Sequence, residues 1–119
     1  MGITNITGTV ASVHNLKKKQ KIRFLVDTGA SYTVLPLNYV KTLGLKATKT
    51  QDFTLADGTI VKRDLGYAMI EIDGQESPST VILGEKGDSA LLGVITLENM
   101  GLMVDPFKRK LIPMKLMLA

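Results

Sequence analysis

The chain has 119 residues, of which 45% are hydrophobic and 22% are charged, and its formal net charge is +4. It contains no cysteine, which excludes disulfides, thiolate metal sites and a cysteine nucleophile, and its single histidine, His14, makes a Ser-His-Asp triad or a histidine-rich metal site hard to build within one chain. No apolar run is long enough to span a membrane and the sequence does not begin with a secretion signal, so we expect a soluble, cytoplasmic protein.

Short strand-like runs separated by turn signals dominate the sequence, which predicts a single all-β domain over residues 1–119. The first two predicted strands span residues 8–14 and 22–26. The basic residues between them predict a solvated hairpin tip, because no aromatic side chain is interleaved to stack on nucleic-acid bases. A nucleic-acid site here is the alternative, and steep salt dependence of binding would support it. The basic cluster consists of Lys17, Lys18, Lys19, Lys21 and Arg23.

After these strands the pattern predicts a short helix over residues 37–43, which ends where Gly44 can adopt the left-handed conformation of a helix C-terminus. Two hairpins follow, because an Asp-Gly pair between strand-forming runs favours a tight turn that needs φ > 0. The first joins residues 53–55 to 59–62 through Ala56-Asp57-Gly58, and the second joins residues 67–72 to 80–83 through Asp73-Gly74.

A second short helix is predicted over residues 94–100, and it ends at Gly101. It echoes the first helix, since each follows a glycine, Gly29 or Gly93, and each closes with an apolar residue, a glycine and a leucine. A two-fold pseudo-repeat within the domain explains this echo, and so does the general pattern of short helices that end in a glycine cap. Beyond the helix, Asp105-Pro106 predicts a further turn.

The strand that ends at Val26 leads directly into Asp27-Thr28-Gly29, which places a carboxylate at the end of a buried strand. Placing a charged group at such a position costs free energy, which suggests that the carboxylate has a function. A carboxylate can act as a general base or a general acid, but one carboxylate cannot hold both protonation states at once. Two carboxylates that share a site divide these roles, because repulsion raises one of the two pKa values. A two-fold dimer would supply the second Asp27; the alternative is a simple turn that begins with Asp.

The residues around Asp27 have possible roles in this arrangement. Gly29 allows a tight turn and brings its N–H toward the carboxylate, Thr28 can offer its hydroxyl across the two-fold axis, and Ser31 is close enough to bond a carboxyl oxygen.

Several segments together resemble the retropepsins and their cellular relatives, the retroviral-protease-like domains, in order and spacing over roughly residues 8–105. The first is the active-site segment, and the second is an apolar-apolar-Gly signature about 60 residues later that leads into a short helix. Between them lies a hairpin where retropepsins carry the flap. These segments are Asp27-Thr28-Gly29-Ala30-Ser31 with Thr33-Val34-Leu35, then Ala90-Leu91-Leu92-Gly93, and between them the flap hairpin around Ala56-Asp57-Gly58.

The resemblance implies a retropepsin-like closed acid-protease barrel, one lobe per subunit with one or two short helices, active as a two-fold homodimer. It implies an aspartic endopeptidase in which a water activated by the two carboxylates attacks the peptide carbonyl directly, without a cofactor or metal. An extended peptide or protein substrate would pair with the flaps, and neither nucleic acid nor membrane is an expected partner. The implied residues are Asp27 as the catalytic group, Thr28, Gly29, Ala30 and Ser31 as its support, Leu55, Ala56, Asp57, Gly58 and Thr59 in the flap and substrate site, and Leu91, Leu92 and Gly93 in the second signature.

The sequence departs from the viral pattern at three places. Ser31 replaces an acidic residue that is common in viral enzymes, and the flap tip is not a run of glycines. The C-terminal stretch is also longer, and there Ile112 and Met114 could form an interface strand, although Pro113 favours an edge position because it cannot donate a hydrogen bond. A catalytically weak peptide-binding or dimerisation module with the same fold is the alternative function.

Overall fold

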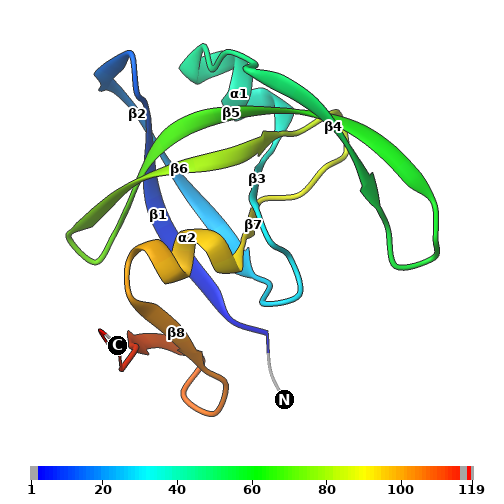
Figure 1. The fold of residues 1–119 in the computed structure, drawn as a ribbon. Helices are drawn as coiled ribbons and strands as arrows, with labels where there is room; N and C mark the ends of the chain where they lie inside the picture. The colour runs from blue at the N-terminus through cyan, green and yellow to red at the C-terminus, as the bar shows by residue number, and fades with distance from the viewer. Residues whose placement is uncertain (1–2, 116–117, 119) are drawn as a thin grey trace.

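The structure is a computed structural model that describes residues 3–115 and 118. The single domain predicted over residues 1–119 therefore includes residues outside this description. Most of the described chain is β-structure, with two short helices (Figure 1). In chain order the elements are β1 (Asn5–Ser12), β2 (Asn15–Val26), β3 (Thr33–Leu35), α1 (Leu37–Leu43), β4 (Lys49–Thr54), β5 (Ile60–Ile72), β6 (Gln75–Leu83), β7 (Leu91–Leu92), α2 (Val94–Asn99), β8 (Leu102–Asp105) and β9 (Lys110–Pro113).

The main sheet closes on itself. Its strand order is β1-β2-β7-β3-β6-β5-β4, and an additional pairing joins β1 to β5. Strand β1 thus lies between β2 and β5, and its residues Thr9 to Ser12 face Glu71 to Ala68. Closure leaves few open strand edges, which is how small β-barrels protect their backbone groups. The predicted closed all-β barrel with two short helices is confirmed.

The sheet also relates the two halves of the chain. Strand β2 pairs in parallel with β7, and β6 pairs in parallel with β3, while β3 and β7 pair antiparallel to each other. Exchanging β1, β2, β3 and α1 for β5, β6, β7 and α2 reproduces the same set of pairings, including the antiparallel pair of β1 and β5. The echo between the two helices therefore reflects a two-fold pseudo-repeat in the fold.

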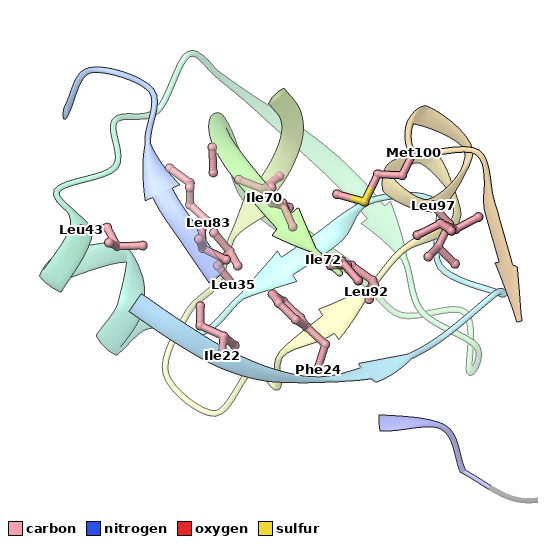
Figure 2. Packing of buried hydrophobic residues seen from close by; sticks show 14 residues of the cluster. Ile22, Phe24, Leu35, Leu43, Ile70, Ile72, Leu83, Leu92, Leu97 and Met100 are labelled. Atoms are coloured by element: carbon pink, nitrogen blue, oxygen red, sulfur yellow. The ribbon is translucent and has the colours of Figure 1, made fainter. Parts of the chain in front are cut away.

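The core lies inside this barrel. Alternate residues of β2 point inward, so Ile22 and Phe24 are 1% and 0% exposed, while the basic residues between and beside them face out. Figure 2 shows both side chains directed into a cluster that also contains Leu92 of β7 and Leu97 of α2. Each fully buried side chain of this size stabilises the fold by about 1.5–3 kcal/mol. Side chains from the ends of β2 and β7, which carry the candidate site, thus pack into this one cluster.

The prediction that Lys17 to Arg23 form a hairpin tip is wrong. The turn between β1 and β2 consists of Val13 and His14, and β2 begins at Asn15, seven residues before the predicted start. Lysine is tolerated here because the side chains concerned are exposed, and from Lys19 onward the backbone of β2 is paired with β1. A register shift between Ala11 and Ser12 accommodates the extra residues of β2.

The other predicted turns and helices are close to those observed. Helix α1 has the predicted bounds and ends at Gly44, which has φ 64°, whereas α2 ends one residue earlier than predicted, before Met100. The flap turn at Gly58 has φ 87°. The strands predicted over residues 59–62 and 67–72 are one continuous strand, β5, because β4 pairs with its first half and β6 with its second.

The C-terminal part forms a separate two-stranded sheet of β8 and β9. Pro113 lies opposite Leu102, and the N–H of Met114 donates to the carbonyl oxygen of Gly101 at 2.7 Å. Strand β9 is paired only with β8 among the described residues, in agreement with the edge position expected from Pro113. No helix in the described part of the chain is long and apolar enough to cross a membrane.

Candidate active site

Asp27 lies immediately after β2, where the chain is held on both sides. The N–H of Asp27 donates to the carbonyl oxygen of Leu92 at 3.1 Å, and the N–H of Val26 donates to that of Thr4 at 2.8 Å. These bonds belong to opposite edges of β2, one toward β7 and the other toward the segment before β1. The position of the Asp27 backbone is therefore fixed by the barrel and not by the loop alone.

The carboxylate of Asp27 faces the loop that follows it. The N–H of Gly29 donates to its Oδ1 at 2.9 Å, and the N–H of Ala30 donates to the Asp27 carbonyl oxygen at 3.1 Å. A Cβ on residue 29 would lie 3.2 Å from the same Oδ1, so glycine allows the close approach. Asp27 is half-buried, while Thr28 and Gly29 are exposed. The arrangement presents an oriented carboxylate at the surface of the chain.

Ala30 and Ser31 connect this loop to α2. Their carbonyl oxygens accept the N–H groups of Val94 at 2.9 Å and Ile95 at 3.0 Å, which satisfies donors in the first turn of the helix. The expected bond from the Ser31 hydroxyl to the Asp27 carboxylate is not among the hydrogen bonds of the described residues, and the Ser31 side chain is exposed. Ser31 thus acts through its backbone in this structure.

The Leu91-Leu92-Gly93 segment lies beside the Asp27 loop. A Cβ on residue 93 would lie 2.4 Å from the carbonyl carbon of Tyr32, so only glycine fits there. The N–H of Gly93 donates to Oγ1 of Thr33 at 3.0 Å, and this hydroxyl is 2.7 Å from Oγ1 of Thr96. Thr33 and Thr96 are both 0% exposed. Sequence analysis missed this buried pair, and its only signal is a threonine within each of two apolar runs.

The flap hairpin, residues 55–59, lies at the end of the arm formed by β4 and β5, apart from the Asp27 loop (Figure 1). The N–H of Leu55 donates to the carbonyl oxygen of Thr59 at 2.7 Å, and Ala56, Asp57 and Gly58 form the exposed turn between them. The Asp57 carboxylate accepts bonds from Thr59, including its N–H at 2.9 Å, and these bonds lower the pKa of Asp57. Hydrogen bonds within the turn therefore hold the tip of the flap hairpin in one conformation.

Residues 14–99 match the protein family described as "gag-polyprotein putative aspartyl protease". This chain belongs to the retropepsin-like aspartic proteases. Its fold is similar to a retropepsin-like aspartic protease from Rickettsia conorii, with 28% identity and a TM-score of 0.58 over 87% of this chain and 77% of that one. No curated protein sequence matches it.

Two further solved structures share the retropepsin-like fold at lower sequence identity. The retroviral protease-like domain of Ddi1 from Leishmania major is 12% identical with a TM-score of 0.65, and the match covers 95% of this chain and 89% of that one. The protease of simian foamy virus (mac) is 17% identical with a TM-score of 0.57, over 79% of this chain and 91% of that one.

Two pockets separate the Asp27 loop of this retropepsin-like chain from its flap arm. The first, of about 340 Å³, lies between the Asp27 loop and β4, and the second, of about 190 Å³, lies beneath the flap arm beside Leu91. Val34, Phe53 and Ile82 line both, and the ring of Tyr32 packs edge-on against Phe53 at 6.2 Å between centroids. The pockets thus form one trough that runs from the loop to the flap, and its lining is mainly apolar in the second pocket and mixed beside the Asp27 loop.

An ion pair closes one end of the second pocket. The Nε and Nη2 atoms of Arg63 donate to the two carboxylate oxygens of Asp88 at 2.7 and 3.1 Å, and Asp88 also accepts the N–H of Glu85 at 2.8 Å. The Arg63 guanidinium lowers the pKa of Asp88, and the carboxylate raises the pKa of Arg63 in turn. The pair joins the base of the flap arm to the loop before β7.

Within the described residues, no group of three or more His, Cys, Asp or Glu side chains is placed to hold a metal ion. The structure brings the Asp27 loop together with the second signature, and it places the flap hairpin across the trough from both. Leu55 is the flap residue that lines a pocket, in common with Leu91.

Proposed function

We propose that this chain is an aspartic endopeptidase that acts as a homodimer, with one Asp27 from each subunit at a shared site. The observation that carries the proposal is the half-buried Asp27 carboxylate, oriented by the N–H of Gly29 at the end of β2 and placed beside the trough. Each chain supplies one such group, and general acid–base hydrolysis needs two in different protonation states.

The proposed reaction uses both Asp27 residues of the dimer. The ionised carboxylate removes a proton from a water molecule as the water oxygen bonds to the peptide carbonyl carbon. The protonated carboxyl of the other subunit gives its proton to the carbonyl oxygen. When the tetrahedral intermediate collapses, the carboxyl that took the water proton gives it to the leaving nitrogen as the C–N bond breaks. A hydroxyl of the intermediate returns its proton to the other carboxylate, so that a carboxylic acid and an amine are released and the pair regains its starting protonation.

The substrate is proposed to be an extended peptide that lies between the Asp27 loop and the flap hairpin. Its backbone would pair with the flap as an added strand, which sends alternate side chains toward the trough. The lining by Val34, Phe53 and Ile82 fits bulky apolar side chains at those positions. Proteins of the cytoplasm are the proposed source of such peptides.

The edge of β8 away from β9, which is unpaired within residues 3–115, is the proposed dimer interface. Residues 101 and 114 are a hydrogen-bonded pair, because the N–H of Met114 donates to the carbonyl oxygen of Gly101. Bonded and non-bonded pairs alternate along antiparallel strands, so residue 102 is not hydrogen-bonded to residue 113, and residue 104 is not hydrogen-bonded to residue 111. The backbone groups of Leu102 and Val104 therefore point away from β9. The corresponding outer edge of β9 lacks a donor at Pro113. Pairing of β8 with its two-fold copy would form a four-stranded sheet.

Cleavage of a peptide library from about pH 4 to pH 7 tests the proposed reaction. Asp27→Asn removes the acid and preserves the shape of the side chain, so we expect loss of cleavage with an unchanged circular dichroism spectrum and an unchanged dimer by sedimentation. Asp52→Asn, an exposed change of the same type in β4, is the control and should cleave normally. Cleavage by Asp27→Asn at the wild-type rate would refute the mechanism, and an inactive wild-type dimer would favour a peptide-binding module.

A proline pair tests the interface. Val104→Pro removes an outward N–H from β8, whereas Leu111→Pro removes one from the outer edge of β9, and the two residues face each other in the hairpin. Both are partly buried against the core, so their effects on folding should be similar. We expect Val104→Pro to yield monomers and Leu111→Pro to remain dimeric. Dimers of equal stability in both variants would exclude the β8 edge.

A further inference from the structure

Three basic side chains stand in a row on the outer face of β2. Lys19, Lys21 and Arg23 are exposed and alternate with Gln20, which is half-buried, and with the core residues Ile22 and Phe24, which are 1% and 0% exposed. Successive side chains on one face of a strand are about 6.7 Å apart, so the row is roughly 13 Å long. We infer that this row, the basic face, is a docking surface for an extended acidic segment of a protein partner.

The charges of the basic face are not neutralised within the chain. Among residues 3–115 and 118, the only ion pair within 4.0 Å is that of Arg63 and Asp88, which belongs to the trough. The β1 residues that pair with the basic face, Ala11, Thr9 and Thr7, are uncharged. The next strand carries Glu71, opposite Thr9 and about two strand spacings, or roughly 10 Å, from Lys21. Three adjacent cations are therefore available to an external anion.

The spacing of the basic face fits an extended peptide. Alternate side chains of such a peptide repeat at the same distance of about 6.7 Å, so acidic residues at positions i, i+2 and i+4 can each meet one cation. A pocket of about 140 Å³ that includes Lys19 in its lining offers an apolar side chain of the same segment a place to bind, because Leu16, Ala11 and Met69 also line it. Glu71 and Glu76 line its far side, so the acidic side chains of the segment would lie over β2 and not over the pocket. Leu16 is 50% exposed there. Charge and apolar contact together favour a peptide over a plain polyanion.

Nucleic acid fits this face less well. The β1 residues beside the cations are threonines and an alanine, so no aromatic ring lies between the strands to stack on bases. Glu71 and Glu76 line the far side of the adjoining pocket and would repel the second strand of a duplex. The row of cations is one strand wide, which suits a single extended acidic chain.

Fluorescence anisotropy tests the inference without reference to proteolysis. The probe is a labelled peptide of about ten residues in which Glu alternates with Ser, and its partner probes are the same peptide with Gln in place of Glu and a thymidine oligonucleotide of equal charge. The protein variants are the triple substitution Lys19→Glu, Lys21→Glu, Arg23→Glu and a control, Lys46→Glu, Lys49→Glu, Lys108→Glu, at exposed positions outside the basic face. Both triple variants change the net charge from +4 to −2.

The inference predicts that the Glu peptide binds the wild type and the control variant in the same range, and that reversal of the basic face weakens binding by about tenfold or more, since three exposed ion pairs each contribute modestly. Binding should weaken as salt rises, because exposed charges are screened. Mass spectrometry checks that the peptide stays intact. Equal loss of binding in the two triple variants would overturn the inference, because net charge alone would then explain it. Tighter binding of the oligonucleotide, or equal binding of the Gln peptide, would overturn it as well.

Discussion

The ion pair of Arg63 and Asp88 should contribute measurably to stability, and Asp88→Asn removes its charge with little change of shape. Hydrogen bonds to charged groups contribute about 1.5–3 kcal/mol each when they are shielded, and fully exposed pairs about 0.2–1 kcal/mol. The two side chains are 21% and 25% exposed, which lies between these limits. We therefore expect Asp88→Asn to lower the free energy of unfolding by about 1.5 kcal/mol, or the Tm by roughly 5 °C.

The effect should depend on pH in a defined direction. The pKa of Asp88 in the folded chain lies below its ordinary value of 3.8, because Arg63 stabilises the ionised form. The folded state gains from this carboxylate at pH values above the unfolded pKa, and it loses that gain as the pH falls through the folded pKa. The difference in Tm between wild type and Asp88→Asn should thus be constant from pH 7 to about pH 5 and shrink below about pH 4. Arg63 stays charged throughout.

Thermal unfolding followed by circular dichroism at one fixed protein concentration measures these differences, since stability of a dimer depends on concentration. Asp52→Asn serves as the control for loss of an exposed carboxylate. A double-mutant cycle with Arg63→Met should give a coupling free energy near 1 kcal/mol. A coupling energy of zero, or a Tm difference that persists unchanged at pH 3, would refute the assignment of the stability to this pair.

Three other substitutions have predictable effects. Gly93→Ala should destabilise the fold by more than about 3 kcal/mol or prevent folding, because the new Cβ would meet the Tyr32 backbone at 2.4 Å; soluble yield and Tm measure this, and a normal Tm would contradict it. Thr33→Val leaves the Gly93 N–H without its acceptor and Thr96 without its partner, and should cost about 2 kcal/mol in urea unfolding; Thr33→Ser should retain most of that stability. Gly58→Ala, where a Cβ meets nothing within 4 Å but φ is 87°, should cost only about 1 kcal/mol and slow peptide cleavage through the flap; a Tm loss as large as that of Gly93→Ala would contradict this.

Local signals in the sequence were sufficient for three turns that contain glycine, but not for the turn at Val13 and His14. Gly44, Gly58 and Gly74 all have positive φ, and each was predicted from its place after a helix or in an Asp-Gly pair. The Asp27 loop and the second signature were identified because their residues are contiguous in the chain. Such features depend on neighbours a few positions away, which a single sequence displays directly.

Features that depend on pairing between distant strands were not predictable. Lysines have low strand propensity, so residues 17–21 suggested a tip, although all of them lie in β2 and Lys19 and Lys21 pair with Ala11 and Thr9 of β1. Gly66 lies inside β5 and is required there because a Cβ would lie 2.6 Å from the carbonyl oxygen of Lys46, a contact that no local pattern marks. The ion pair of Arg63 and Asp88 joins residues 25 positions apart, and no local pattern marks its two members.

The hydrogen bonds that surround Gly93 have a consequence for the order of folding. They connect residues 60 and 63 positions apart in the chain. Contacts of this separation form late, because the loop between them must lose its conformational freedom before they can contribute. The backbone of the Asp27 loop can reach its final position only after residues 92–95 have arrived, because the N–H of Asp27 donates to Leu92 and the loop accepts the N–H groups of residues 94 and 95. Synthesis from the N-terminus therefore delays assembly of this loop until most of the barrel has been made.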